Sequence, residues 1–187
     1  MKLRVAGLVM TLALFALPAI VAAAPHTRGG FTLGLGLGGG SAGISANGNS
    51  SDRQSGTAGS FRAAYIFLPQ FGVGIETNLW TKDQNGATLT FSVAAATLSY
   101  YPGASGLYLR GGVGVGTTEL EAKIGSVTLS GSQDGLGVIG AGGYEWRLGR
   151  SFAIGPEIDF GYASLDGYTT NYVNGQLQFN WYFIPRE

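Results

Sequence analysis

The stretch LGVIGAGGYEWRLGRSFAIGPEIDFGY, residues 136–162, decides the fold, because alternate residues in it form two faces of opposite character. One face is small or charged and carries Glu145, Arg147, Glu157 and Asp159. The other face is mostly large and apolar, and it consists of Leu136, Val138, Gly140, Gly142, Tyr144, Trp146, Leu148, Phe152, Ile154, Pro156, Ile158, Phe160 and Tyr162. Alternation with a period of two on both sides of a tight glycine-containing turn predicts an antiparallel β-hairpin.

The same alternation recurs in eight segments of the chain. They span roughly residues 30–38, 59–68, 71–82, 87–101, 107–118, 135–148, 152–163 and 172–183. Each is close to the length of about 9–11 residues that a tilted strand needs to cross a bilayer. The apolar face carries no charge in any segment, and a Lys or Arg there would cost about 2–4 kcal/mol at the bilayer midplane. The sequence therefore predicts an all-β fold, an eight-stranded antiparallel up-and-down transmembrane β-barrel.

Two local features depart from this regular pattern. Pro156 has no backbone donor for a β-ladder, so it predicts a bulge in the segment 152–163. In the segment 87–101, Leu98 and Tyr100 fall on the polar phase, which predicts a shift of register near the rim. The residues assigned to the lipid-facing phase of this segment are Leu89, Phe91, Val93 and Ala95.

Composition limits the classes of protein to which the chain can belong. Only 12% of its 187 residues are charged, against about 25% in soluble domains. Its formal net charge is zero and it has no basic block, which argues against a nucleic-acid partner. It contains no Cys, which excludes disulfides, thiolate metal ligands and a cysteine nucleophile.

The N-terminal residues form a targeting segment. Two basic residues precede an apolar run over 5–20 and small residues over 21–23. This order predicts a cleavable signal peptide over 1–23, so the chain is exported, and a single barrel domain over 24–187. An uncleaved anchor is the alternative, but the apolar run is short for a membrane span. No other run of about 18 apolar residues remains, so strands are the expected route across a bilayer.

The polar phase of the strands faces the inside of the predicted barrel. Eight strands enclose a space that side chains just fill. An unpaired buried charge would be destabilising by about 3–5 kcal/mol, so we expect each interior arginine to pair with a carboxylate. The predicted interior ion-pair network consists of Arg62, Glu76, Arg110, Glu145, Arg147, Glu157 and Asp159.

The connections between the strands alternate in length. Those near residues 69, 103 and 150 are short, 39–58 and 119–134 are long, 164–171 is intermediate, and 82–86 is a short exception. The composition of 39–58 predicts a mobile, exposed loop. Short turns on one side and longer loops on the other are typical of an outer-membrane barrel with both termini in the periplasm. The predicted periplasmic aromatic girdle consists of Phe31, Phe67, Phe71, Tyr101, Tyr144, Trp146, Phe152, Trp181 and Phe183.

The chain resembles the small eight-stranded outer-membrane barrels, the OmpX/Ail-like and OmpA-transmembrane-like group of outer membrane β-barrel domain proteins. The resemblance covers the mature chain and rests on the signal segment, GLYLRGGVGVG at 106–116, GAGGYEWRL at 140–148 and LQFNWYF at 177–183. It implies a location in the bacterial outer membrane. Members of the group typically end on an aromatic residue that the assembly machinery recognises, whereas here four residues follow Phe183.

Residues with catalytic potential have simpler structural interpretations. The glycine runs at 34–40 and 111–116 do not lead into a helix, as a phosphate-binding loop would. Glu157 and Asp159 project from one face of a strand, and we interpret them as partners of interior arginines. His26 is the only histidine, and apart from it there is no base to activate a serine.

Four acidic residues in the predicted loops have side chains suited to Ca²⁺ or to the cation-bridged sugars of the outer leaflet, although acids in loops are usually just solvated. They are Glu119, Glu121, Asp134 and Asp166. We predict no catalytic, cofactor-binding or metal site, and therefore no enzyme.

The predicted function is that of a non-catalytic, monomeric outer-membrane barrel with a plugged polar interior. It would contribute to envelope integrity or bind partners through its extracellular loops. The expected partners are outer-membrane lipid and lipopolysaccharide and the outer-membrane assembly machinery. Two alternatives remain open: a narrow pore for small solutes, and an exported soluble β-barrel that binds a small apolar ligand with the aromatic face turned inward.

Overall fold

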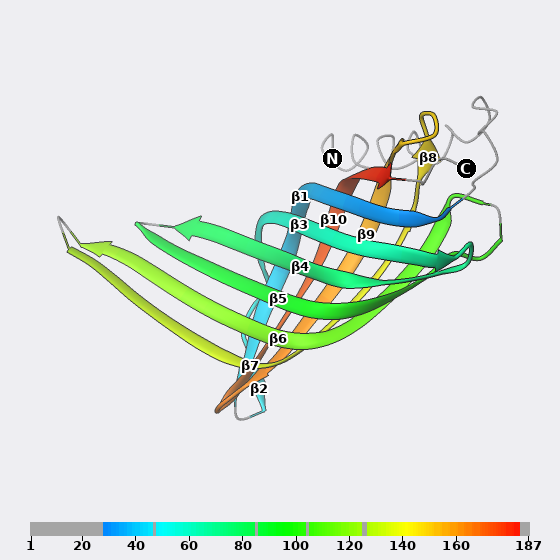
Figure 1. Ribbon diagram of the computed structural model, residues 1–187. Helices are drawn as coiled ribbons and strands as arrows, with labels where there is room; N and C mark the ends of the chain where they lie inside the picture. The colour runs from blue at the N-terminus through cyan, green and yellow to red at the C-terminus, as the bar shows by residue number, and fades with distance from the viewer. Residues whose placement is uncertain (1–27, 47, 85, 104, 125–126, 184–187) are drawn as a thin grey trace, which may run out of the picture.

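The computed structural model describes residues 28–46, 48–84, 86–103, 105–124 and 127–183 (Figure 1). The predicted signal peptide, His26 and the four residues after Phe183 lie outside these ranges. Eight long strands carry the fold: β1 (Gly30–Ala46), β3 (Gln54–Leu68), β4 (Phe71–Gln84), β5 (Ala87–Tyr100), β6 (Leu107–Ile124), β7 (Val127–Tyr144), β9 (Phe152–Leu165) and β10 (Tyr168–Phe183). Two short strands, β2 (Asn49–Ser50) and β8 (Trp146–Arg147), pair with β1 and β9.

The eight long strands form a closed antiparallel barrel. Each pairs with its neighbours in sequence, and β1 pairs with β10 from Phe31 opposite Phe183 to Ser45 opposite Thr169. Both described ends of the chain therefore lie at one end of the barrel, which we call the terminal end; the opposite end is the hairpin end (Figure 1). The prediction of an eight-stranded up-and-down barrel is confirmed.

Alternation of side chains sets which face of each strand points inward. In β9, for example, Glu157 and Asp159 are buried whereas Ile158 is 66% exposed. Because successive side chains of a strand point to opposite faces, this pattern places the carboxylates inside the barrel and the isoleucine outside. Among the described residues, no helix is long and apolar enough to cross a membrane.

The prediction of long loops over 39–58 and 119–134 is wrong for most of these residues. Much of 39–58 belongs to β1, β2 and β3, and much of 119–134 belongs to β6 and β7. The strands continue far into these segments, and Gly86 and Gly167, which lie between β4 and β5 and between β9 and β10, have φ of 79° and 83°. Only glycine adopts such positive φ values without strain, so these turns end long hairpins rather than open loops.

The predicted phase of β5 is also wrong. Phe91 and Val93 are buried inside the barrel, whereas Leu98 and Tyr100 are 53% and 41% exposed on the outside. The ladder with β4 runs without a shift from Gln84 opposite Ala87 to Phe71 opposite Tyr100. The predicted register shift is therefore absent. Leu89, Phe91, Val93 and Ala95 were predicted to face lipid, but their side of the whole strand faces the inside of the barrel.

Pro156 interrupts a ladder without forming the predicted bulge. Its pairing with Leu177 of β10 is continuous with that of its neighbours. On the other side, the pairing of β9 stops at Gly143 opposite Glu157 and resumes at Trp146 opposite Ile154, three residues further on both strands. No extra residue is inserted; instead, the N–H of Glu145 donates to the carbonyl of Gly106 at 2.9 Å.

Candidate functional site

The interior of the barrel gathers the charged residues of the strands. Arg110 lies between two carboxylates at its middle: its Nη2 is 2.7 Å from Glu157 Oε2 and 2.9 Å from Glu76 Oε1, and its Nε contacts the other oxygen of Glu76. Tyr108 donates its hydroxyl to Glu157 Oε2 at 2.8 Å. β4, β6 and β9 supply these groups, so the ion pairs connect opposite walls of the barrel. We call Glu76, Arg110 and Glu157 the central cluster.

Amide side chains hold the next carboxylate toward the hairpin end. Asp159 accepts hydrogen bonds from Asn174 at 2.9 Å, from Gln176 at 2.5 Å and from Asn78 at 3.5 Å. The predicted arginine partner for Asp159 is therefore wrong within the described residues. Arg62 also lacks an ion pair among the described residues and instead donates to Asn180 Oδ1 at 2.8 Å.

A second ion cluster lies at the terminal end of the interior. Glu145 Oε1 is 3.0 Å from Arg28 Nη2 and 3.8 Å from Arg147 Nε, and Glu145 Oε2 accepts from the hydroxyl of Tyr182 at 2.5 Å. Arg28 also donates to the carbonyl of Ser105 at 2.7 Å. Sequence reasoning missed Arg28 because it precedes the first predicted strand and has no alternation to place it.

The guanidinium groups at this end lie over aromatic rings. Arg28 is 4.5 Å from the ring centre of Tyr101, and Arg147 is 3.5 Å from that of Tyr182. Cations over aromatic faces are stabilised by the ring quadrupole. Tyr108 and Tyr182 were missed as network members, although their places on the polar phase of LYLR and NWYF were a usable signal.

Toward the hairpin end the interior becomes apolar. Trp80, Phe91, Val93, Ile139 and Tyr172 are buried together in one cluster with Ala42 and Ala95. The rings of Trp80 and Phe91 stack with centres 5.3 Å apart. The indole N–H of Trp80 donates to the carbonyl of Gly40 at 3.3 Å, so its polar atom is satisfied. We call these seven residues the apolar cluster.

Eight of the nine residues of the predicted aromatic girdle lie at the terminal end with partly exposed rings. Three of their contacts are Phe31 with Phe183, Tyr144 with Trp146 and Phe152 with Trp181, at ring-centre distances of 6.0, 5.5 and 5.4 Å. The remaining two of the eight are Phe67 and Phe71. Tyr101 was placed wrongly, since it is 2% exposed inside the barrel. Its neighbour Tyr100 contacts Phe71 instead, at 5.2 Å.

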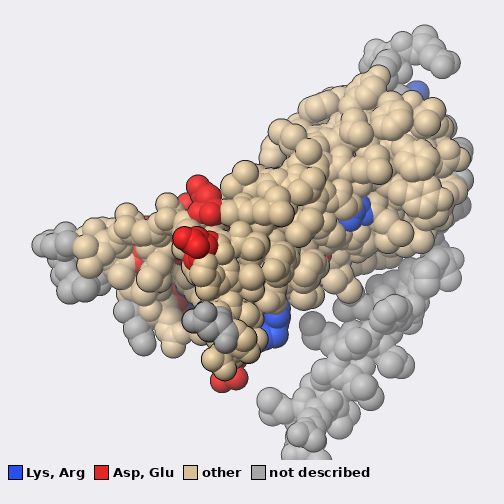
Figure 2. Space-filling model, turned by 90° about the horizontal axis from the view of Figure 1, so that it is seen from below, with Lys and Arg blue, Asp and Glu red and all other residues tan. Residues whose placement is uncertain are grey.

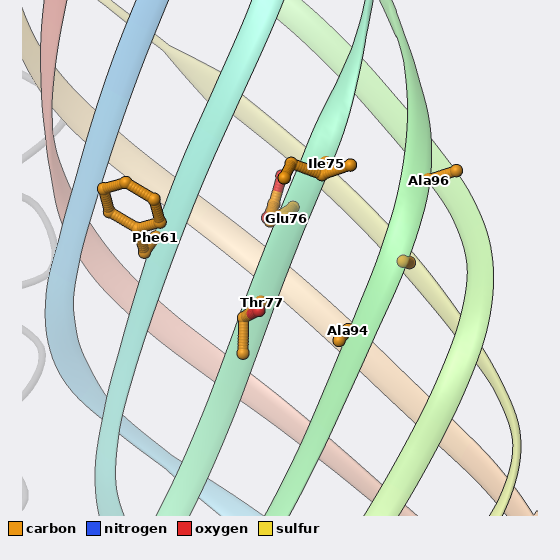
Figure 3. Close-up of a pocket in the computed structure, with 7 residues that line it drawn as sticks. Phe61, Ile75, Glu76, Thr77, Ala94 and Ala96 are labelled. Atoms are coloured by element: carbon orange, nitrogen blue, oxygen red, sulfur yellow. The ribbon is translucent and has the colours of Figure 1, made fainter.

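The outer surface offers hollows but little chemistry. Figure 3 shows one of about 330 Å³ on the outer side of β3–β5, where the short side chains of Thr77, Ala94 and Ala96 leave space beside Phe61 and Ile75. Its lining is almost entirely apolar, so it suits a lipid chain better than a polar substrate. Among the described residues, no group of three or more His, Asp or Glu is arranged to hold a metal ion.

The orientation of the two faces excludes a soluble carrier with an apolar interior. Trp181 is 40% exposed on the outside, and Arg110 and Glu157 are buried inside. A closed barrel with an apolar exterior and ion pairs within is the class of protein that crosses membranes with strands.

Residues 9–183 match the family model of the outer membrane protein beta-barrel domain, so the chain belongs to that family and is a protein of the bacterial outer membrane. None of the curated protein sequences matches it.

Solved structures with this fold come from several bacteria. Ail, the attachment invasion locus protein of Yersinia pestis, solved with the heparin analogue sucrose octasulfate, is 13% identical over 81% of this chain and 99% of its own, with a TM-score of 0.58. Neisserial surface protein A is 12% identical over 82% and 97%, with a TM-score of 0.57. OprG of Pseudomonas aeruginosa is 18% identical over 86% and 99%, with a TM-score of 0.50. At these identities the similarity is one of fold.

Proposed function

We propose that this protein is a non-catalytic outer-membrane barrel whose lumen is closed to solutes and whose protruding hairpins bind molecules outside the cell. The observation that carries the closed lumen is the bridge from Arg110 to Glu76 and Glu157, because it spans the interior at its middle. Solutes would have to break buried ion pairs to pass, and an unpaired buried charge costs about 3–5 kcal/mol.

Two further layers support a closed lumen. At the terminal end, Arg28, Glu145 and Arg147 lie between the rings of Tyr101 and Tyr182. At the hairpin end, the apolar cluster is 5% exposed or less at every member. An ion that passed the central cluster would therefore still meet a buried, mostly apolar layer, in which the indole N–H of Trp80 and the hydroxyl of Tyr172 already donate to backbone carbonyls.

The hairpins are the part of the barrel free to meet partners. Outer-membrane barrels have short periplasmic turns and longer extracellular connections, so the hairpin end lies outside the cell and the terminal end in the periplasm. Lipid and lipopolysaccharide surround the outer face, and the ladders close without an open edge in the membrane, which suits a monomer. The assembly machinery is the expected partner during insertion.

The charge of the hairpin end favours cationic over anionic partners. Six acids are exposed there: Asp52, Asp83, Glu119, Glu121, Asp134 and Asp166. The basic residues in the same parts of the sequence are Arg53, Lys82 and Lys123. Ail was solved with a sulfated sugar, but in this protein such a polyanion would meet a net negative surface. Bound cations of the sugar layer are better matched to it.

Planar-bilayer conductance tests the closed lumen. The purified full-length protein should insert without stepwise openings. The positive control is a quadruple variant in which Glu76, Arg110 and Glu157 are replaced by Ser and Phe91 by Ala. This variant lacks both the ion pairs and a large side chain of the apolar cluster, so it should give openings. Regular openings of the wild-type protein would show a narrow pore and overturn the proposal.

A further inference from the structure

The apolar character of the lumen continues past the apolar cluster into the open hairpin end. Ile44 and Leu89 pack against that cluster. Leu120 pairs with Leu89 across β5 and β6, and it follows the buried Thr118 on the same face. Leu129 lies on the inward face of β7, ten residues before the buried Ile139. Yet Leu120 and Leu129 are 51% and 57% exposed, although both lie on the inward phase of their strands rather than on the outer face.

This face is open because the barrel wall separates beside it. The ladder between β7 and β9 begins only at Leu136 opposite Ser164, so the residues of β7 before Leu136 pair with β6 alone. Figure 1 shows β4–β7 running to one side at this end, away from β1, β9 and β10. Beside this opening, the side chain of Gln133 donates to the carbonyl of Asp166 at 3.0 Å.

The segment 128–132 is therefore an unpaired sheet edge. Its sequence, TLSGS, contains no charge and no proline. Natural proteins usually protect exposed edges with charged residues or proline, because an unpaired row of N–H and C=O groups accepts another strand. The exposed Leu129 belongs to this segment, so the edge offers both unpaired backbone groups and an apolar side chain to a partner.

Charge selects among the partners that could use this edge. The acids Glu119 and Asp134 lie on the two strands that carry the exposed leucines. The two basic side chains described at this end are already engaged: Arg53 donates to Ser41 and Asn171, and Lys82 donates to Gln54. Figure 2 shows several acidic groups toward the end where the hairpins protrude, with a basic group near them and an uncharged surface over much of the rest of that view.

We propose that the hairpin end binds an extended, cationic peptide segment with alternating apolar side chains. Its backbone pairs with β7 at 128–132, its apolar side chains cover Leu120 and Leu129, and its cations face the acidic side chains. This inference rests on the surface-binding part of the proposed function and does not depend on the closed lumen.

An extended peptide fits better than a small molecule. Small-molecule sites bury most of their ligand's surface, whereas the hollow beside Leu89 and Leu120 has a volume of only about 280 Å³ and is open. A strand added to an edge obtains affinity from main-chain hydrogen bonds and specificity from alternate side chains. The two exposed leucines supply the alternate contacts.

The test is a binding titration with the full-length protein in nanodiscs of zwitterionic lipid, followed by fluorescence anisotropy. The probe is a labelled peptide that alternates lysine with valine and is long enough to pair with the free edge. We expect saturable binding that weakens as salt rises, because exposed charges are screened. A peptide that alternates glutamate with valine should bind at least about ten-fold more weakly, and empty nanodiscs should bind neither peptide.

Matched variants separate the apolar face from net charge. Leu129→Lys places a charge on the inward face and removes the apolar side chain that the peptide would cover, so it should weaken binding about ten-fold or more. Ser55→Lys adds the same charge at an exposed position of β3, on another strand of the hairpin end, and should change affinity much less. Retention of the folded band on an unheated gel shows that both variants form the barrel.

Three results would overturn the inference: no binding of the lysine peptide, equal binding of the glutamate peptide, or equal effects of the two variants. If the lysine peptide fails to bind while bilayers show no conductance, the closed lumen stands and this inference alone is lost. If the peptide binds while wild-type protein conducts, the closed lumen is lost instead.

Discussion

Arg110 Nη2 lies 2.7 Å from Glu157 Oε2, and both side chains are at most 1% exposed. The same arginine contacts Glu76 of β4, on the side of the barrel opposite β9. Two carboxylates therefore share one buried cation, and neither has another arginine within ion-pair distance among the described residues. The stability of the barrel should depend on that one guanidinium.

Replacement of Arg110 by Met should lower the free energy of unfolding by about 3–5 kcal/mol, because it leaves uncompensated buried carboxylates. Reversible urea unfolding in lipid vesicles, followed by tryptophan fluorescence, measures the change. The control is Arg150→Met at an exposed turn position, which should change stability by less than about 0.5 kcal/mol. Equal stability of the two variants would contradict the account of the central cluster.

Neutralising the whole cluster should cost less than breaking it. In the variant Glu76→Gln, Arg110→Met, Glu157→Gln, no buried charge is left without a partner. A buried ion pair replaced by well-fitting neutral groups is often close to neutral in stability. We expect this triple variant to unfold at higher urea concentration than Arg110→Met alone, and the reverse order would refute the pairing.

Close approach of strands makes glycine necessary at some inward positions. A Cβ on Gly114 of β6 would lie 2.0 Å from the carbonyl oxygen of Ala94, whereas one on Gly111 would meet only the carbonyl of Ile139 at 3.9 Å. Gly114→Ala should therefore destabilise the barrel by about 1–3 kcal/mol. Gly111→Ala in the same strand is the control and should stay within about 0.5 kcal/mol of the wild type. The same urea experiment measures both.

The outer face should reject charge only where lipid covers it. Ile75 is 65% exposed at mid-strand on the outside of β4. Ile75→Arg should reduce stability in vesicles by about 2–4 kcal/mol. Ser132→Arg, at an exposed position of the hairpin end, should have little effect. Similar losses at both positions would mean that the membrane boundary lies elsewhere.

The number of strands and the membrane-crossing face were predictable because alternation is a local property of the sequence. Ile158 and Glu157 are neighbours with opposite chemistry, so their strand could be oriented from two residues. The same reasoning placed Arg110 and Glu145 inside. It could not choose partners, since pairing depends on the stagger of strands around the barrel.

The phase of β5 was predicted wrongly because apolar residues lie on both of its faces. Phe91 and Val93 are larger than Ala94 and Ala96, which made their face look lipid-facing. The structure buries the large residues against Trp80. Large apolar side chains fill the interior toward the hairpin end, so the size of the residues on one strand was a misleading guide to the lipid-facing side. Leu98 and Tyr100 carried the correct signal.

The length of the hairpins was underestimated for a different reason. Residues 39–58 are rich in Gly, Ser and Asn, a composition that usually indicates loops. Here the ladders of β1 with β10 and of β1 with β3 continue through this composition because their neighbours impose the register. Tertiary pairing overrides the weak preference of each residue.

Single-tryptophan quenching tests the orientation of the barrel most directly. Trp181 is 40% exposed on the outer face and Trp80 is fully buried in the lumen. In vesicles of brominated lipid, a variant that keeps only Trp181 should lose much of its fluorescence, whereas a variant that keeps only Trp80 should retain most of it. Strong quenching of Trp80 together with an unquenched Trp181 would contradict the account, because it would place the aromatic face inside and the ion pairs toward lipid.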